Sequence, residues 1–312
     1  MNEVLPHGVT GVHALPADHH DGAWDAVLVP SRVKERLLAT ALLVLRHGAR
    51  LAGSATAPHG LIVLAGPPGT GKSTLARGLA QAVARELAPR GATTLVEADP
   101  HAFPSELLGE SQRAVARLFG ETLPELAARR PHTLVLFDEV EALAVRRQSA
   151  SFDTNPVDVH RATDAVLSGL DSLRAARPGT LLVVTTNFPE AVDEAFLSRA
   201  DLLVRTGLPG EDVVPLIVAD SLRELAAQWP GLRALAGDEE THRAVAKRLA
   251  GLDGRRIRKA VHAALAQRLA VAREPELLGV RDLLSAAEEA AAELGSRTAG
   301  TGPQDARSAR SG

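Results

Sequence analysis

One eight-residue stretch limits the possible folds of this chain more than any other feature of the sequence. It fits the pattern G-x-x-x-x-G-K-[ST] at every required position and consists of Gly66, Pro67, Pro68, Gly69, Thr70, Gly71, Lys72 and Ser73. The apolar run 61–65 before it is typical of a buried strand, and residues 74–86 after it have the spacing of an amphipathic helix. A glycine-rich turn between strand and helix can direct backbone N–H groups toward a polyphosphate, because no Cβ stands in the way. The sequence therefore predicts a phosphate-binding loop.

The end of this loop carries the residues expected to contact ATP and Mg²⁺. Lys72 is expected to reach the β- and γ-phosphates and Ser73 to ligate Mg²⁺, with Thr74 also in the nucleotide-binding set. The chain has four lysines, Lys34, Lys72, Lys247 and Lys259, among 35 lysines and arginines. A lysine at position 72 is therefore hard to explain by composition alone.

Length, charge and residue usage narrow the class of protein. With 312 residues and 45% hydrophobic content, the chain is long enough for about two domains with sizeable cores. A net charge of −3 and the absence of cysteine make nucleic acid an unexpected partner and exclude disulfides. The start lacks the features of a secretory signal, and the longest apolar run, residues 37–45, is too short to span a bilayer. We expect a soluble cytoplasmic protein with no membrane association.

Two later strand ends carry polar residues suited to hydrolysis of a bound nucleotide. The apolar run 134–137 ends in Asp138 and Glu139, which fits a parallel strand buried on both faces. Asp138 is expected to hold Mg²⁺ and Glu139 to activate the attacking water, although such a pair can also cap a helix. The run 180–186 ends in Asn187, which is expected to contact the γ-phosphate or the water. A turn-forming asparagine is the simpler alternative.

Two arginines that lie away from these strand ends are candidates for contacts with a bound nucleotide. Arg199 is a candidate arginine finger acting on a neighbouring subunit's nucleotide, and a surface ion pair with Asp201 is the alternative. Arg255 belongs to a cationic cluster at 251–259 that could reach a nucleotide held between domains. A solvated basic face is the other explanation for that cluster.

Leu107 and Leu108 lie in a segment, 103–111, that is expected to be a loop beside the nucleotide domain. They are candidates for a loop that grips substrate, or they could simply close a helix onto the sheet. Pro104 to Ser111 contains no cation and carries Glu106 and Glu110, so the loop suits a polypeptide better than a phosphate backbone.

The predicted organisation has four parts. Residues 1–23 form a flexible N-terminal arm, 24–207 a large α/β nucleotide-binding domain, 208–295 a small all-helical lid and 296–312 a disordered tail. In the lid, helices are expected near 213–229, 238–249, 255–274 and 280–294.

Taken in order, these motifs resemble an AAA+ ATPase over about residues 24–294, with a parallel sheet flanked by helices and a helical lid. Within that superfamily the chain is most similar to the group of pachytene checkpoint protein 2 (thyroid receptor interacting protein 13), which remodels HORMA-domain proteins. The residues that carry this resemblance are Gly66 to Ser73, Asp138 to Leu143, Asn155 to Asp158, Asp164 to Leu167, Thr185 to Phe188, Val192 to Asp201 and Gly251 to Arg255.

The resemblance implies roles for individual residues. It makes Asn187 sensor 1, Arg199 the finger, Arg255 the sensor 2 arginine, and Leu107 and Leu108 the pore loop. It also implies ATP and Mg²⁺ as cofactors and a homo-oligomeric, hexameric ring. The substrate would be a protein, a HORMA-domain protein in particular, and the composition favours bacterial members that act in anti-phage signalling through cyclic oligonucleotides.

Two departures from the eukaryotic members stand out. Those members have a folded N-terminal domain, for which the predicted arm is too short, and an aromatic pore loop in place of two leucines. A nucleic-acid-directed motor or clamp-loader-like ATPase is the main competing function, and a scaffold with little turnover is a third.

Overall fold

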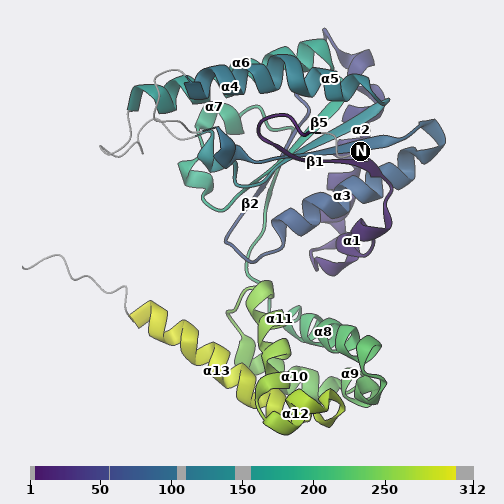
Figure 1. Ribbon diagram of the computed structural model, residues 1–312, viewed down its shortest axis with the longest axis vertical. Coiled ribbons are helices and arrows are strands. Elements are labelled where there is room, and N and C mark those ends of the chain that lie inside the picture. Colours follow the sequence, from purple (N-terminus) through teal and green to yellow (C-terminus); the bar gives the residue numbers. More distant parts are fainter. Residues whose placement is uncertain (1–3, 56, 104–109, 145–155, 300–312) are drawn as a thin grey trace, which may run out of the picture. The chain divides into compact units, whose positions relative to one another are not determined.

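The computed structural model describes residues 4–55, 57–103, 110–144 and 156–299 of the chain (Figure 1). The chain divides into two compact units, residues 1–206 and residues 207–312. None of the helices in the described part combines the length and apolarity that crossing a membrane requires.

The first unit is built on a six-stranded sheet in the order β1-β3-β4-β5-β2-β6. β1 runs antiparallel to β3, and all other neighbouring strands are parallel. This arrangement confirms the predicted α/β class. The strands are β1 (Val9–Leu15), β2 (Leu61–Ala65), β3 (Thr93–Ala98), β4 (His132–Phe137), β5 (Thr180–Thr186) and β6 (Leu202–Arg205).

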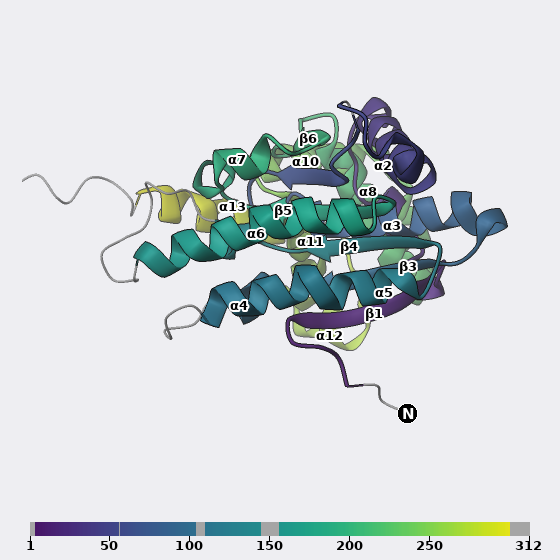
Figure 2. The same cartoon turned by 90° about the horizontal axis from the view of Figure 1, so that it is seen from above.

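Helices cover both faces of the sheet, as Figure 2 shows. One face carries α2 and α3, and the other carries α4, α5 and α6. Successive residues of a strand point to opposite faces, so Ile62 packs with the first helices and Val63 with the second. The unit's helices are α1 (Ala23–Ala26), α2 (Ser31–Leu51), α3 (Lys72–Leu87), α4 (Glu110–Arg117), α5 (Leu123–Ala128), α6 (Pro156–Ala176) and α7 (Glu194–Leu197).

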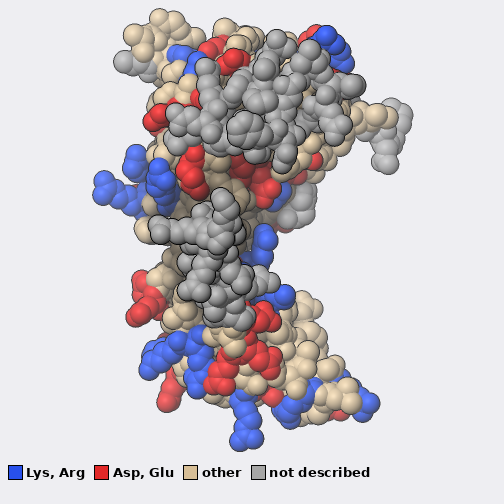
Figure 3. All heavy atoms as spheres, turned by 90° about the vertical axis from the view of Figure 1, so that its left-hand side faces the viewer, with Lys and Arg blue, Asp and Glu red and all other residues tan. Residues whose placement is uncertain are grey.

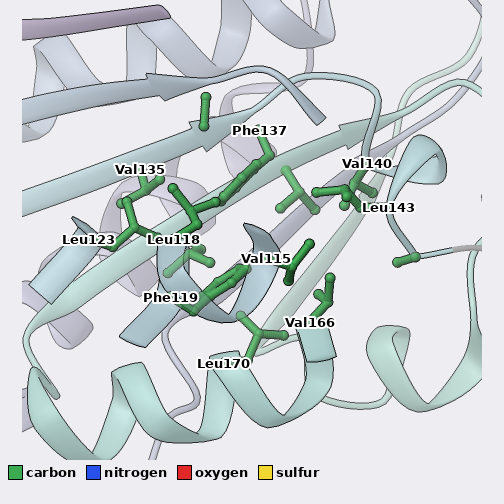
Figure 4. Packing of buried hydrophobic residues seen from close by; sticks show 14 of the residues in the cluster. Val115, Leu118, Phe119, Leu123, Val135, Phe137, Val140, Leu143, Val166 and Leu170 are labelled. Atoms are coloured by element: carbon green, nitrogen blue, oxygen red, sulfur yellow. The ribbon is translucent and has the colours of Figure 1, made fainter. Parts of the chain in front are cut away.

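Two stacked phenylalanines hold the second helical layer against the sheet. Phe119 lies in the π-helical turn between α4 and α5, and its ring stacks on Phe137 of β4 with centroids 5.8 Å apart (Figure 4). Both side chains are buried, together with Val166 and Leu170 of α6. This packing fixes the end of β4, where Asp138 and Glu139 follow.

The N-terminal segment differs from the predicted flexible arm. Val9–Leu15 forms the edge strand β1, which pairs along most of its length with β3. Gly8 O also accepts a hydrogen bond from Asp99 N at 2.9 Å, and the His7 and Phe103 rings meet edge to face. These partners lie about 80 to 95 residues away in the sequence, so the local pattern of the arm does not reveal them.

Within its described residues, 207–299, the second unit has helices and no strand, as predicted, and it has a core of its own. The helix predicted over 255–274 is not continuous, because the chain leaves the helical conformation at Arg268, which is extended and donates to Asp282 at 2.6 and 2.8 Å. The last helix reaches Ala299, beyond the predicted end. The helices are α8 (Val214–Gln228), α9 (Arg233–Ala236), α10 (Glu239–Leu249), α11 (Gly254–Ala263), α12 (Leu269–Arg273) and α13 (Val280–Ala299).

Candidate functional site

The predicted phosphate-binding loop connects β2 to α3, and its backbone is pressed against the rest of the unit. Gly66 has φ +151°, and a Cβ there would lie 2.1 Å from Thr206 O, so only glycine fits. Gly69 and Gly71 also have positive φ, and the helix start at Gly71 has no side-chain cap. The N–H groups of the first turn of α3 are thus left for an anionic ligand, beside exposed Thr74.

Lys72 joins the loop to the end of β5. Its side chain is buried, and Nζ donates to Gly66 O at 2.7 Å, to Pro67 O at 2.8 Å and to Asn187 Oδ1 at 2.8 Å. The contact with Asn187 arises because β5 is the neighbour of β2 in the sheet. Two residues that are 115 positions apart in the sequence are therefore hydrogen-bonded.

The two predicted Mg²⁺ ligands are in direct contact. Ser73 Oγ donates to Asp138 Oδ1 at 2.7 Å, and the Thr185 hydroxyl donates to the same oxygen. A carboxylate with adjacent hydroxyls is a hard oxygen donor set, which fits Mg²⁺ when the remaining ligands are phosphate and water. Among the described residues, no cluster of three or more His, Asp or Glu offers a metal site built from protein alone. The group thus suits a Mg²⁺ ion that arrives with a nucleotide.

Glu139 lies at a sharp turn where β4 ends. It is the one non-glycine residue with positive φ, 62°, in the described chain. Residues in this conformation are uncommon outside glycine and are found at functional sites more often than elsewhere. Its N–H donates to Thr185 Oγ1 at 3.0 Å, so the turn is tied to β5.

Both carboxylate oxygens of Glu139 are engaged. Oε1 accepts from Asn187 Nδ2 at 2.9 Å, and Oε2 lies 3.2 Å from His101 Nε2. Half of the Glu139 side chain remains exposed, so water can reach it. A chain of hydrogen bonds thus runs from Lys72 through Asn187 to Glu139. This network brings together the lysine of the phosphate-binding loop, the strand-end asparagine and the predicted base.

Three residues that contact this network were not predicted from the sequence. Thr185 bridges Asp138 and the backbone of Glu139, His101 contacts the predicted base, and Glu141 Oε1 accepts from Asn187 N at 3.0 Å. The position of Thr185, two residues before the strand-end asparagine, is a local signal from which its role could have been predicted. His101 and Glu141 have no such signal, because their roles depend on which strands are neighbours.

Arg199 forms an ion pair, but its partner is not Asp201, the residue considered from the sequence alone. Its Nε and Nη2 donate to the two oxygens of Asp171 at 3.2 and 3.0 Å. Asp201 instead accepts hydrogen bonds from the N–H groups of His59, Gly60 and Leu61, at 2.6 to 3.0 Å, and so holds the start of β2. The alternative of an Arg199–Asp201 pair is therefore wrong.

Arg255 lies in the first turn of α11, in the second unit. Arg256 pairs with Asp253 and Arg258 with Asp220 and Glu224, whereas Arg255 is exposed and has no acidic partner within the described chain. A cation at a helix N-terminus is opposed by the helix dipole, so it does not stabilise its own helix. Its contact with a nucleotide stays a prediction. Leu107 and Leu108 lie outside the described residues.

The arrangement supports phosphate binding and attack by water at the carboxyl edge of the parallel sheet. Such edges are where open α/β sheets bind ligands, because parallel strands bring the ends of different segments together. Here β4, β5 and β2 are consecutive in the sheet and supply the carboxylates, the asparagine and the phosphate loop.

Comparisons with known proteins agree with this chemistry. The model of the ATPase family associated with various cellular activities (AAA) matches residues 62–208. The chain is 43% identical over 286 residues to CD-NTase-associated protein 6 of Pseudomonas aeruginosa. The alignment covers 92% of this chain and 93% of that protein. The chain is 34% identical over 218 residues to the pachytene checkpoint protein 2 homolog of Arabidopsis thaliana, covering 69% of this chain.

The alignment spans 46% of the Arabidopsis protein, and similar shares of the other pachytene checkpoint protein 2 homologs, so this chain corresponds to about half of those relatives. In three dimensions the fold is similar to that of a chain in the solved E. coli MS115-1 HORMA:CdnC:Trip13 complex. The TM-score is 0.71 at 20% sequence identity, covering 90% of this chain and 95% of the other.

Proposed function

Since the chain belongs to the AAA family of ATPases, in the group of CD-NTase-associated protein 6 and the pachytene checkpoint protein 2 homologs, we propose that it couples ATP hydrolysis to remodelling of a protein substrate. The observation that supports the hydrolytic part best is the hydrogen-bonded series from Lys72 through Asn187 to Glu139. It joins a phosphate-binding cation to a carboxylate that water can reach.

Each residue of the series has a defined task in the proposed reaction. Lys72, which is now bound to two loop carbonyls and Asn187, would neutralise the β- and γ-phosphates of ATP. Ser73 and Asp138 would hold Mg²⁺, which supplies charge stabilisation on the same phosphates. Glu139 would accept the proton of the attacking water, with its carboxylate oriented by the Asn187 amide.

Arg199 would complete this site in the next subunit of a hexameric ring. A finger that acts on a neighbour's nucleotide requires a heterologous contact between subunits, and such contacts close into rings when the rotation allows. The sensor role of Arg255 is part of the same proposal. Its exposure and lack of an acidic partner within the described chain leave it available for a phosphate.

The proposed substrate is a HORMA-domain protein, and the proposed setting is anti-phage signalling through cyclic oligonucleotides. The support is that one relative is named for its association with a CD-NTase, and that a protein of the same fold forms a complex with HORMA and CdnC. Among the described side chains on the face drawn in Figure 3, acidic and basic ones are interspersed, which suits a protein partner better than a nucleic acid.

The test uses the purified full chain, its ATP turnover and a panel of bacterial HORMA-domain proteins. Glu139→Gln should bind ATP, lose about 10²-fold or more in turnover, and retain a HORMA protein in a pull-down, because the amide cannot take the proton. Glu125→Gln is the matched control, since Glu125 is exposed on α5. Normal turnover in Glu139→Gln would remove the residue from the base role, and stimulation by single-stranded DNA but by no HORMA protein would favour a nucleic-acid motor.

A further inference from the structure

Arg199 is held in one orientation by its own chain. Its Nε and Nη2 donate to the two oxygens of Asp171, at 3.2 and 3.0 Å, and its Nη1 donates to Ala195 O at 2.9 Å. Two parallel bonds to one carboxylate fix the plane of a guanidinium as well as its position. The side chain is therefore oriented before any other subunit approaches.

The carboxylate that holds it belongs to a rigid part of the fold. Asp171 lies on α6 between Leu170 and Leu173, which are both buried in the core. The next turn is tied down by Arg174, whose Nη2 donates to Ala57 O at 2.9 Å. α6 and α7 lie side by side in both Figure 1 and Figure 2. Asp171 thus connects a surface arginine to the core of the unit.

Stability alone gives little reason for this pair. The Asp171 side chain is 52% exposed, and ion pairs as exposed as this contribute little to folding. The hydrogen bond from Arg199 lowers the pKa of Asp171, so the carboxylate remains ionised at neutral pH. What the pair does provide is a fixed direction for a permanently charged group.

The same geometry leaves donors for another acceptor. A guanidinium has five N–H groups, and the three hydrogen bonds to Asp171 and Ala195 use one each on Nε, Nη1 and Nη2. One N–H on Nη1 and one on Nη2 are not used by these contacts. A phosphate could accept the unused N–H on Nη2 without breaking the fork with Asp171.

We propose that Asp171 is a positioning residue for Arg199 and orients its guanidinium toward the nucleotide of the neighbouring subunit. The proposal rests on the finger role proposed for Arg199. A misoriented group can lose much of its catalytic effect even when it remains within reach, since transition-state contacts depend on alignment.

The test measures ATP turnover and nucleotide binding in the full chain carrying Asp171→Asn. The amide keeps one acceptor but loses the charge and the fork, so kcat should fall about tenfold while KM for ATP stays within about twofold. Asp171→Glu, which keeps the carboxylate, should retain more activity than Asp171→Asn. Glu288→Gln is the matched control: it removes an Arg–carboxylate pair of the second unit, at 2.8 Å from Arg248, and should leave turnover unchanged.

The double variant Asp171→Asn with Arg199→Ala should be no slower than Arg199→Ala alone, because the first residue acts through the second. Normal turnover in Arg199→Ala would refute the finger role itself. A slow Arg199→Ala together with a normal or faster Asp171→Asn would overturn only the positioning role. Turnover lost in proportion to loss of the assembled form in sedimentation velocity would also overturn it, since the pair would then be structural.

Discussion

Replacing Thr185 by valine removes the hydroxyl that links Asp138, the proposed Mg²⁺ ligand, to the turn that carries the predicted base. Thr185 Oγ1 donates to Asp138 and accepts from Glu139 N at 3.0 Å, and the side chain is 1% exposed. Valine has nearly the same shape, so the change deletes two hydrogen bonds with little change in packing. We expect both stability and catalysis to suffer.

The size of the stability loss follows from these two bonds. A hydrogen bond to a charged group contributes about 1.5–3 kcal/mol, and a backbone N–H left without a partner costs about 1–3 kcal/mol when buried. Since the region around Glu139 is half-exposed, water will recover part of this. A net loss of about 3 kcal/mol corresponds to a decrease in Tm of roughly 6–12 °C for a unit of this size.

The assay compares thermal unfolding of Thr185→Val with that of Thr94→Val. Thr94 is also in a buried strand, 4% exposed, but its hydroxyl has no hydrogen-bond partner among the residues that the structure describes. The same substitution there should change the free energy of unfolding by less than about 1 kcal/mol. In ATP turnover, Thr185→Val should need more Mg²⁺ for half-maximal activity, and Thr94→Val should not. Equal losses of stability in the two variants would refute the reasoning.

Three further outcomes are expected. Lys72→Ala should weaken ATP binding. Mixing Lys72→Ala subunits with Arg199→Ala subunits should restore part of the activity, because some interfaces then have both Lys72 and Arg199. Mixed rings without recovered activity would contradict a finger that acts between subunits. Replacing Leu107 and Leu108 together by serine should leave basal turnover intact and abolish substrate-stimulated turnover, whereas unchanged remodelling would exclude a gripping role. Burial, with a smaller contribution from Arg90, lowers the pKa of His132 below its ordinary 6.5. Below about pH 6.5 the unfolded chain therefore binds a proton at His132 more readily than the folded chain does, so the free energy of unfolding should decrease as the pH falls below that value. Chemical denaturation at pH 7.5 and 5.5 should show a smaller decrease for His132→Gln than for the unchanged chain.

Some features of this protein depend only on short stretches of sequence. The phosphate-binding loop could be identified because glycine spacing, a preceding apolar run and a following amphipathic run lie next to one another. The strands β2, β4 and β5 were predicted, with an error of two residues at the start of β4, since strands buried on both faces are continuous apolar runs. Asp138, Glu139 and Asn187 were recognisable because each follows directly on such a run.

The tertiary structure decided everything that depends on which segments are neighbours. The strand order places β5 between β2 and β4, and this alone brings Asn187 into contact with both Lys72 and Glu139. The pairing of β1 with β3, the choice of Asp171 over Asp201 by Arg199 and the break in the helix at Arg268 likewise depend on distant partners. Local propensity describes a segment on its own, whereas these contacts form only where the packing of the core brings distant segments within hydrogen-bonding distance.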